Sequence, residues 1–199
     1  MVKILISTIY AFEPVIASAT KISADRLYLL IDKKPDDKQK ASIKMIQQSL
    51  GSVLEIKTVE TEIYDIYEVA KETVKIIDIL SDKDKIFIDI TAGRKTKALG
   101  LLFGAYARGD RIQRIMYVKE ETKQVMNLPK LTYSVTPGQI KIIEFLESHK
   151  IKTMADFASE IKISKSLLYQ SIKDLKRMDI IEETSEGIKL TEYGRIVVL

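Results

Sequence analysis

Short, nearly continuous apolar runs alternate with longer amphipathic segments over the first two thirds of the sequence, and this alternation limits the fold more than any other feature. The apolar runs cover residues 2–6, 26–31 and 85–90, with weaker examples at 52–59 and 113–118. Such runs are typical of parallel strands covered on both faces. The amphipathic segments predict helices over residues 36–50, 64–80 and 94–108. We therefore predict an α/β fold with a Rossmann-like, mainly parallel sheet, to which residues 120–128 add a last hairpin or edge strand.

Near residue 132 the pattern changes to helices followed by a hairpin. Pro137 is well placed to open a first helix, a second helix is expected over residues 154–161, and Ser164 caps a third. A hairpin is expected over residues 179–190. Three helices followed by a two-stranded wing predict a winged helix-turn-helix.

We expect two domains: a Rossmann-like ligand-binding domain over residues 1–131 and a winged helix-turn-helix domain over residues 132–199. The net charge of +4 belongs to the first of them. Residues 1–134 hold 22 basic and 18 acidic side chains, whereas residues 135–199 hold ten of each. An anionic ligand is therefore expected on the N-terminal domain first.

The composition excludes several kinds of site. Without cysteine there is no disulfide framework, no thiolate metal site and no cysteine nucleophile. A single histidine, His149, rules out clustered imidazole ligands, so we expect neither a metal nor a cofactor. The apolar runs are too short and too often interrupted by charges to span a bilayer, and the first residues are too short for a signal-peptide core. We expect a cytoplasmic protein with no membrane partner.

The most informative motif is the segment 89–97, Asp-Ile-Thr-Ala-Gly-Arg-Lys-Thr-Lys, where a predicted strand meets a predicted helix. Open α/β sheets bind ligands at this edge, and the first amides of the following helix suit a phosphate. Arg94, Lys95 and Lys97 add three positive charges, which oppose the helix dipole and would be unexplained in a purely structural turn. The segment matches neither a P-loop nor a dinucleotide fingerprint. The other residues expected to contact an anion here are Thr91, Ala92 and Gly93.

A second candidate loop, residues 7–14, follows the first strand. The first strand of a Rossmann-like sheet is central, so this loop is expected beside Gly93. Ser7 or Thr8 can donate a hydroxyl to phosphate or ribose, and Tyr10 can stack on a base. Ile9, between them, is also expected to contact the ligand. The structural alternative is that these hydroxyls only cap a helix.

The motif Asp89 to Lys95, on a Rossmann-like half followed by a winged helix, resembles the CARF-domain proteins, the CRISPR-associated Rossmann folds. The resemblance implies a two-fold homodimer that binds cyclic oligoadenylate, usually cyclic tetra-adenylate, across its axis. One branch of this family consists of ring nucleases that cleave the cyclic messenger and switch off antiviral signalling. The Gly93-Arg94-Lys95 triplet is similar to that branch. Lys95 then corresponds to its important lysine, and Ser7 or Thr8 to its hydroxyl residue.

Ring cleavage needs no metal in principle. The ribose 2′-OH attacks the neighbouring phosphorus, while Lys95, Arg94 and the loop amides stabilise the developing charge. We expect slow turnover, because no general base is evident in either loop. The catalytic residues of this hypothesis are Lys95, Arg94 and Ser7.

The other branch consists of ligand-responsive transcription regulators that bind DNA through the winged helix without catalysis. The third helix presents side chains suited to phosphate and base contacts: Lys165, Ser166, Tyr169, Gln170, Lys173, Lys176 and Arg177. Against this, the wing carries Glu182, Glu183 and Glu186, and the domain is neutral overall. A dimerisation or lid role for this domain therefore stays open, as does a winged-helix repressor that senses another nucleotide.

Overall fold

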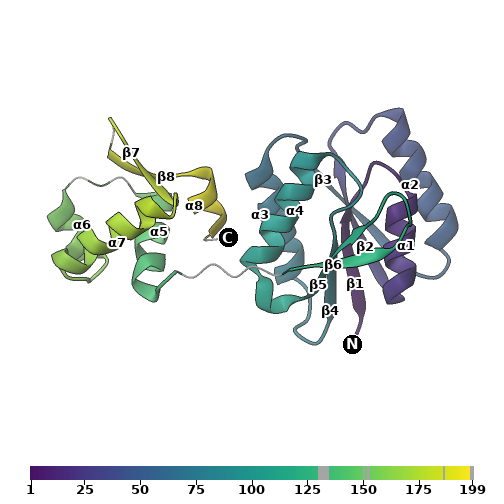
Figure 1. Cartoon of the computed structure of the whole chain (residues 1–199), viewed down its shortest axis with the longest axis horizontal. Helices are drawn as coiled ribbons and strands as arrows, with labels where there is room; N and C mark the ends of the chain where they lie inside the picture. Colours follow the sequence, from purple (N-terminus) through teal and green to yellow (C-terminus); the bar gives the residue numbers. More distant parts are fainter. Residues whose placement is uncertain (130–134, 150, 152, 186, 198–199) are drawn as a thin grey trace. The chain divides into compact units, whose positions relative to one another are not determined.

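The computed structural model describes residues 1–129, 135–149, 151, 153–185 and 187–197, with the backbone alone for 192 and 193. The chain divides into two compact units, Met1–Thr132 and Tyr133–Leu199 (Figure 1). The predicted domain boundary between residues 131 and 132 lies outside the described residues.

A six-stranded sheet forms the centre of the first unit, with the strand order β3-β2-β1-β4-β5-β6 (Figure 1). The first five strands are parallel and β6 pairs antiparallel with β5. The predicted Rossmann-like α/β fold and the loosely defined edge strand are both confirmed. The strands are β1 Lys3–Thr8, β2 Arg26–Asp32, β3 Glu55–Thr61, β4 Lys85–Asp89, β5 Ile112–Val118 and β6 Val125–Leu128.

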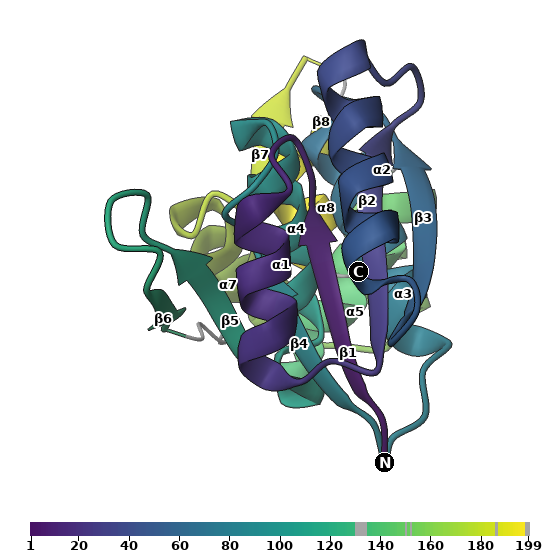
Figure 2. The same cartoon turned by 90° about the vertical axis from the view of Figure 1, so that its right-hand side faces the viewer.

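Helices cover both faces of this sheet and enclose two apolar cores. Figure 2 shows two of them in front of the sheet, α1 Glu13–Ile22 and α2 Asp37–Leu50. On the other face α3 Ile66–Asp78 and α4 Lys95–Ala107 pack on the isoleucines of β1 and β4. A short 3₁₀ turn, η1 Gly109–Arg111, leads into β5.

Two features of the first unit differ from the sequence prediction. Helix α1 was not predicted, although Glu13 and Pro14 in its first turn are common helix-start residues. Strand β1 continues through Thr8 instead of ending at Ile6, because the pairing with β2 and β4 extends to Ser7 and beyond. Ser7 and Thr8 therefore belong to the strand and not to the loop that follows it.

The second unit contains helices and one hairpin around its own apolar core. Its elements are α5 Pro137–Ser148, α6 Met154–Glu160, α7 Lys165–Arg177, β7 Ile181–Thr184, β8 Gly187–Leu190 and α8 Glu192–Val197. A capping box between Thr136 and Gln139 begins α5, and Ser164 caps α7. The order of three helices and a hairpin agrees with the predicted elements, α8 was not predicted, and the winged-helix assignment stays a prediction.

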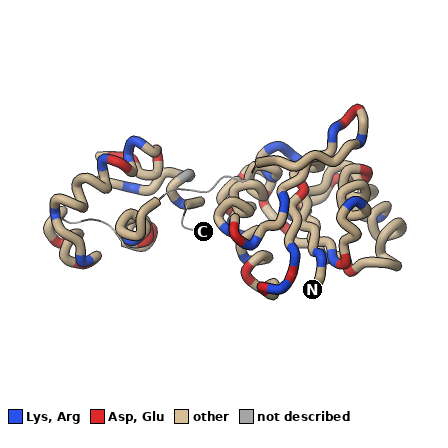
Figure 3. The backbone as a smooth tube through the Cα atoms, turned by 60° about the horizontal axis from the view of Figure 1, so that its bottom comes forward, with Lys and Arg blue, Asp and Glu red and all other residues tan. Residues whose placement is uncertain are grey.

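Charged residues of both signs are interspersed along both units (Figure 3). Glu186, part of the predicted acidic wing, lies outside the described residues. Within the part of the chain that the structure describes, no helix is both long and apolar enough to cross a membrane.

Candidate anion-binding site

The carboxyl ends of β1 and β4 lie side by side, and the loop that follows β4 contacts the end of β1. Ser7 pairs with Asp89 in the parallel register, as the central position of β1 predicted. Gly93 has φ +110°, and a Cβ placed on it would lie 2.7 Å from the Thr8 Cβ. The Thr8 hydroxyl also donates a hydrogen bond to the Ala92 carbonyl. Only glycine at position 93 allows both this backbone conformation and this close approach.

The amino-terminal end of α4 opens directly beside this contact. Arg94 is the N-cap residue in an extended conformation, and no side chain accepts a hydrogen bond from the first amides of the helix. Lys95, the first helical residue, is exposed and forms no hydrogen bond or ion pair with any described residue. Uncapped amides and a free ammonium group together form a surface that attracts a phosphate.

Lys97 does not join Lys95 at the surface. Its side chain is 1% exposed, and its Nζ lies 2.7 Å from Oδ1 of Asp32 at the end of β2. Burial lowers the pKa of Lys97, and the neighbouring Asp32 carboxylate opposes that change. In this arrangement Lys97 is paired with Asp32, and its direct contact with a ligand stays a prediction.

Arg94 is shared among several groups without a tight bond to any of them. Its guanidinium lies 3.8 Å from both the Asp32 and the Asp36 carboxylate and 5.4 Å from the ring centroid of Tyr10. Its Nε has no hydrogen-bond partner among the described residues. Because these contacts are long, Arg94 can exchange them for a phosphate oxygen.

Tyr10 and the start of α2 form the other rim of the site. The Tyr10 hydroxyl donates to Asp36 over 3.3 Å, and Lys38 lies 4.6 Å from the tyrosine ring centroid. The Gln39 amide holds the pKa of Asp36 below its usual value, and Tyr10, Arg94 and Lys38 add to this effect. An ionised Asp36 thus balances part of the positive charge of the rim.

The two candidate hydroxyls are both buried. Ser7 and Thr8 are 0% exposed, and the Ser7 hydroxyl donates to the Thr8 carbonyl over 2.9 Å. Ile9 is also buried, and its carbonyl accepts from the Gln39 side chain. Tyr10 is therefore more accessible to solvent than these three residues.

Asp89 lies beneath the motif loop and supports it from within. Its carboxylate accepts hydrogen bonds from the amide and the hydroxyl of Thr91, and the same hydroxyl accepts from the Val118 amide. Burial raises the pKa of Asp89, while the hydrogen bonds from Thr91 oppose the rise. Thr91 is thus a structural link between β4 and β5.

Two carboxylates of this site, Asp32 and Asp36, were not predicted from the sequence. Asp32 ends the strand that neighbours β1, so the same rule that located the Gly93 loop could have identified it. Its pairing with Lys97, 65 residues away, had no signal in the sequence.

The residues proposed for DNA contact all lie on α7 and are exposed: Lys165, Ser166, Tyr169, Gln170, Lys173 and Arg177. Tyr169 is 57% exposed. Gln170 donates to the Asp174 carboxylate, and Arg177 lies 3.9 Å from the same group. Lys176 instead pairs with Glu183 of the hairpin.

Comparisons with known proteins support the architecture. A family model described as "HFX_2341_N:-like, N-terminal" matches residues 2–123. The fold is similar to that of Can2 from Sulfobacillus thermosulfidooxidans in complex with cyclic tetra-adenylate, with 13% identity and a TM-score of 0.50 over 98% of this chain and 63% of that chain. It is also similar to Enterococcus italicus Csm6 bound to cyclic hexa-2′-fluoro-hexa-dAMP, with 16% identity and a TM-score of 0.51 over 90% of this chain and 55% of that chain.

A third similar structure is a type III CRISPR defence DNA nuclease activated by cyclic oligoadenylate, with 12% identity and a TM-score of 0.50. Here the match covers 80% of this chain and 30% of that chain. This chain thus spans less than two thirds of each of the three proteins. No curated protein matches the sequence significantly.

Proposed function

The chain belongs, over residues 2–123, to the family described as HFX_2341_N:-like, N-terminal, and from this premise we propose that it binds and slowly cleaves cyclic tetra-adenylate. It acts as a homodimeric ring nuclease that ends type III CRISPR signalling. Two of the similar structures hold a cyclic oligonucleotide, which supports this ligand class. The CARF-like motif from Asp89 to Lys95 supports it independently.

The observation that carries the proposal is the position of the Lys95 ammonium, which has no partner among the described residues and lies at the uncapped start of α4. It is next to the close contact between Gly93 and Thr8. A ring with rotational symmetry suits a two-fold dimer in which each subunit offers the same loop. Tyr10 supplies an aromatic face at the rim for a base. Residues 1–131 are the ligand-binding domain in this proposal, and residues 132–199 the winged helix-turn-helix domain.

The reaction is a transesterification within the ring. The ribose 2′-oxygen forms a bond to the adjacent phosphorus, and the bond from phosphorus to the 5′-oxygen breaks. The 2′-OH gives its proton to solvent, and the leaving 5′-oxygen takes up a proton from solvent. Lys95 and Arg94 stabilise the charge that develops on the phosphorane oxygens. The buried Thr8 acts as a positioning residue, since its hydroxyl bonds to the Ala92 carbonyl and joins the end of β1 to the motif loop. Ser7 supports it through its hydrogen bond to the Thr8 carbonyl.

The test is incubation of the intact protein with cyclic tetra-adenylate in the presence of a chelator, followed by mass spectrometry of the products. We expect linear products with a 2′,3′-cyclic phosphate and a free 5′-OH, because the groups named above do not depend on a divalent ion. Recovery of the intact ring after prolonged incubation at the working temperature of the protein would rule out the enzyme.

A second candidate function is a cyclic oligoadenylate-responsive transcription regulator. The exposed basic face of α7 favours it, because Lys173 has no partner among the described residues and Tyr169 is exposed on the same helix. Helices of this kind read DNA from the major groove.

The salt dependence of DNA binding tests this candidate. The logarithm of the affinity for duplex DNA should fall linearly with the logarithm of the salt concentration, because phosphate contacts release counterions. Lys173→Ala and Arg177→Ala should each flatten that slope by about one. Lys71→Ala, an exposed lysine on α3, serves as the control of equal charge change. An unchanged slope in the α7 variants would leave the second unit with a role in dimerisation or ligand enclosure.

A further inference from the structure

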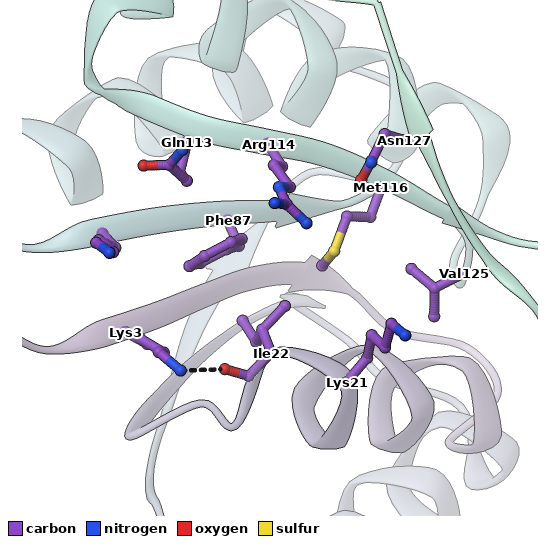
Figure 4. Close-up of a pocket in the computed structure, with 10 residues that line it drawn as sticks. Lys3, Lys21, Ile22, Phe87, Gln113, Arg114, Met116, Val125 and Asn127 are labelled. Carbon is purple, nitrogen blue, oxygen red and sulfur yellow. Dashed lines mark hydrogen bonds between the residues drawn. The ribbon is translucent and has the colours of Figure 1, made fainter.

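A hollow in the first unit begins at the amino-terminal ends of β1 and β4, whereas the Gly93 loop follows the carboxyl end of β4. It has a volume of about 310 Å³ and lies between the carboxyl-terminal end of α1 and strands β4, β5 and β6 (Figure 4). Lys3 and Lys85, which line it, begin β1 and β4, whereas the candidate site lies where these strands end. Phe87 and Met116 form an apolar floor.

Four cationic side chains from four different elements line this hollow, and no carboxylate does: Lys3 of β1, Lys21 of α1, Lys85 of β4 and Arg114 of β5. The side chains of Lys21, Lys85 and Arg114 form no hydrogen bond or ion pair with any residue that the structure describes. The Lys3 ammonium donates to the Ile22 carbonyl over 2.9 Å, so this carbonyl at the end of α1 already accepts a hydrogen bond (Figure 4). Positive charges gathered without counter-charges repel one another, and a bound anion relieves that repulsion.

A β-bulge places the arginine in this hollow. The register of β4 with β5 shifts between Ile86, which pairs with Ile112, and Phe87, which pairs with Arg114. Gln113 is therefore the extra residue, and Arg114 comes to the same face as Phe87 and Met116. Figure 4 shows the Arg114 side chain directed toward these two residues. Bulges that re-aim a side chain in this way are frequent next to functional sites.

From these observations we propose that the hollow is a binding site for a small organic phosphate of about mononucleotide size, separate from the Gly93 loop. Arg114 binds the phosphate, since its guanidinium can hold two phosphate oxygens at once, and Lys85 adds a second positive charge. The apolar body of the ligand lies on Phe87 and Met116, and Gln113 and Asn127 offer amide donors at the side. The volume falls at the lower end of the range for small-molecule pockets.

The experiment is a calorimetric titration of the full chain with AMP, adenosine and inorganic phosphate at constant ionic strength. We expect AMP to bind more tightly than inorganic phosphate, because only AMP also covers the apolar floor, and adenosine to show no binding. The double variant Lys85→Gln/Arg114→Gln should weaken AMP binding at least tenfold. Lys83→Gln, an exposed lysine just before β4, removes the same kind of charge outside the hollow and should have no effect.

Lys95→Ala separates this site from the one proposed for the cyclic ligand. AMP binding that survives Lys95→Ala and is lost in the double variant supports the proposal, whether or not the protein cleaves rings. Three results would overturn it: AMP affinity unchanged in the double variant, adenosine bound as well as AMP, or AMP binding lost only in Lys95→Ala. Sedimentation velocity of the unchanged protein and the double variant gives a fourth such result. If neither of them binds AMP and the double variant differs in oligomeric state, the hollow is instead a contact surface for a second copy of the chain.

Discussion

Replacing Lys95 by alanine is expected to slow the cleavage of cyclic tetra-adenylate by about a hundred- to a thousand-fold. The ammonium group is exposed and unpaired in the described structure, so its full charge is available to the transition state. Ligand binding should weaken much less, because Arg94 and the uncapped amides of α4 remain. Single-turnover rates measured at saturating protein, together with a direct binding titration, separate the two effects.

Lys71→Ala is the matched control for this experiment, since Lys71 is an exposed lysine on α3 without a partner among the described residues. Its cleavage rate should equal that of the unchanged protein. If Lys95→Ala lowers binding and cleavage by the same factor, Lys95 contributes to ground-state affinity only. If it changes neither, the assignment of the site is wrong.

Replacing Lys97 by methionine is expected to lower the free energy of unfolding by about 3–5 kcal/mol, because the buried Asp32 carboxylate loses its nearest partner and keeps only the 3.8 Å contact with Arg94. Both side chains are at most 2% exposed, and the ammonium lies 2.7 Å from the carboxylate. Urea denaturation followed by circular dichroism measures the loss. The double variant Asp32→Leu/Lys97→Met should recover most of it, since no uncompensated charge then remains in the interior.

The exposed pair of Lys75 with Glu72 provides the comparison. Their atoms lie 2.6 Å apart, a similar separation, but the Lys75 side chain is 58% exposed. Lys75→Met should therefore cost less than about 1 kcal/mol. A Lys97→Met loss no larger than that of Lys75→Met would show that Asp32 finds other stabilisation inside the fold.

The strands could be predicted because they depend on the local apolar pattern. The position of the Gly93 loop could be predicted because loops at the carboxyl ends of neighbouring parallel strands lie together. Helix α1 escaped prediction for a physical reason. Its residues include several small and β-branched side chains with weak helix preference, its N-cap Phe12 makes no side-chain bond, and it ends at Ser23 in the left-handed region where glycine is more usual. Packing against the sheet stabilises a helix that its own sequence hardly favours.

The meeting of the Gly93 loop with the end of β1 could be predicted from the sequence, but the arrangement of the charges around it could not. Arg94, Lys95 and Lys97 look equivalent in the sequence, but their surroundings differ. Arg94 lies between two carboxylates, Lys95 is exposed without a partner among the described residues, and Lys97 is buried against Asp32. The difference arises from Asp32, which approaches from another strand. Which cation meets which carboxylate is decided by the packing of distant segments, and the spacing of residues in the motif contains no information about it.

The long contacts of Arg94 determine which anions the loop can discriminate. An incoming phosphate competes with Asp32 and Asp36 for the same guanidinium, so the ligand gains only the difference between the new contact and the two that it replaces. A lone phosphate gains little from that exchange. A ligand that presents a second phosphate to Lys95 gains a contact with no competitor among the described residues. Under the proposed function, we therefore expect the loop to prefer a ligand with two phosphates over inorganic phosphate, without any steric barrier.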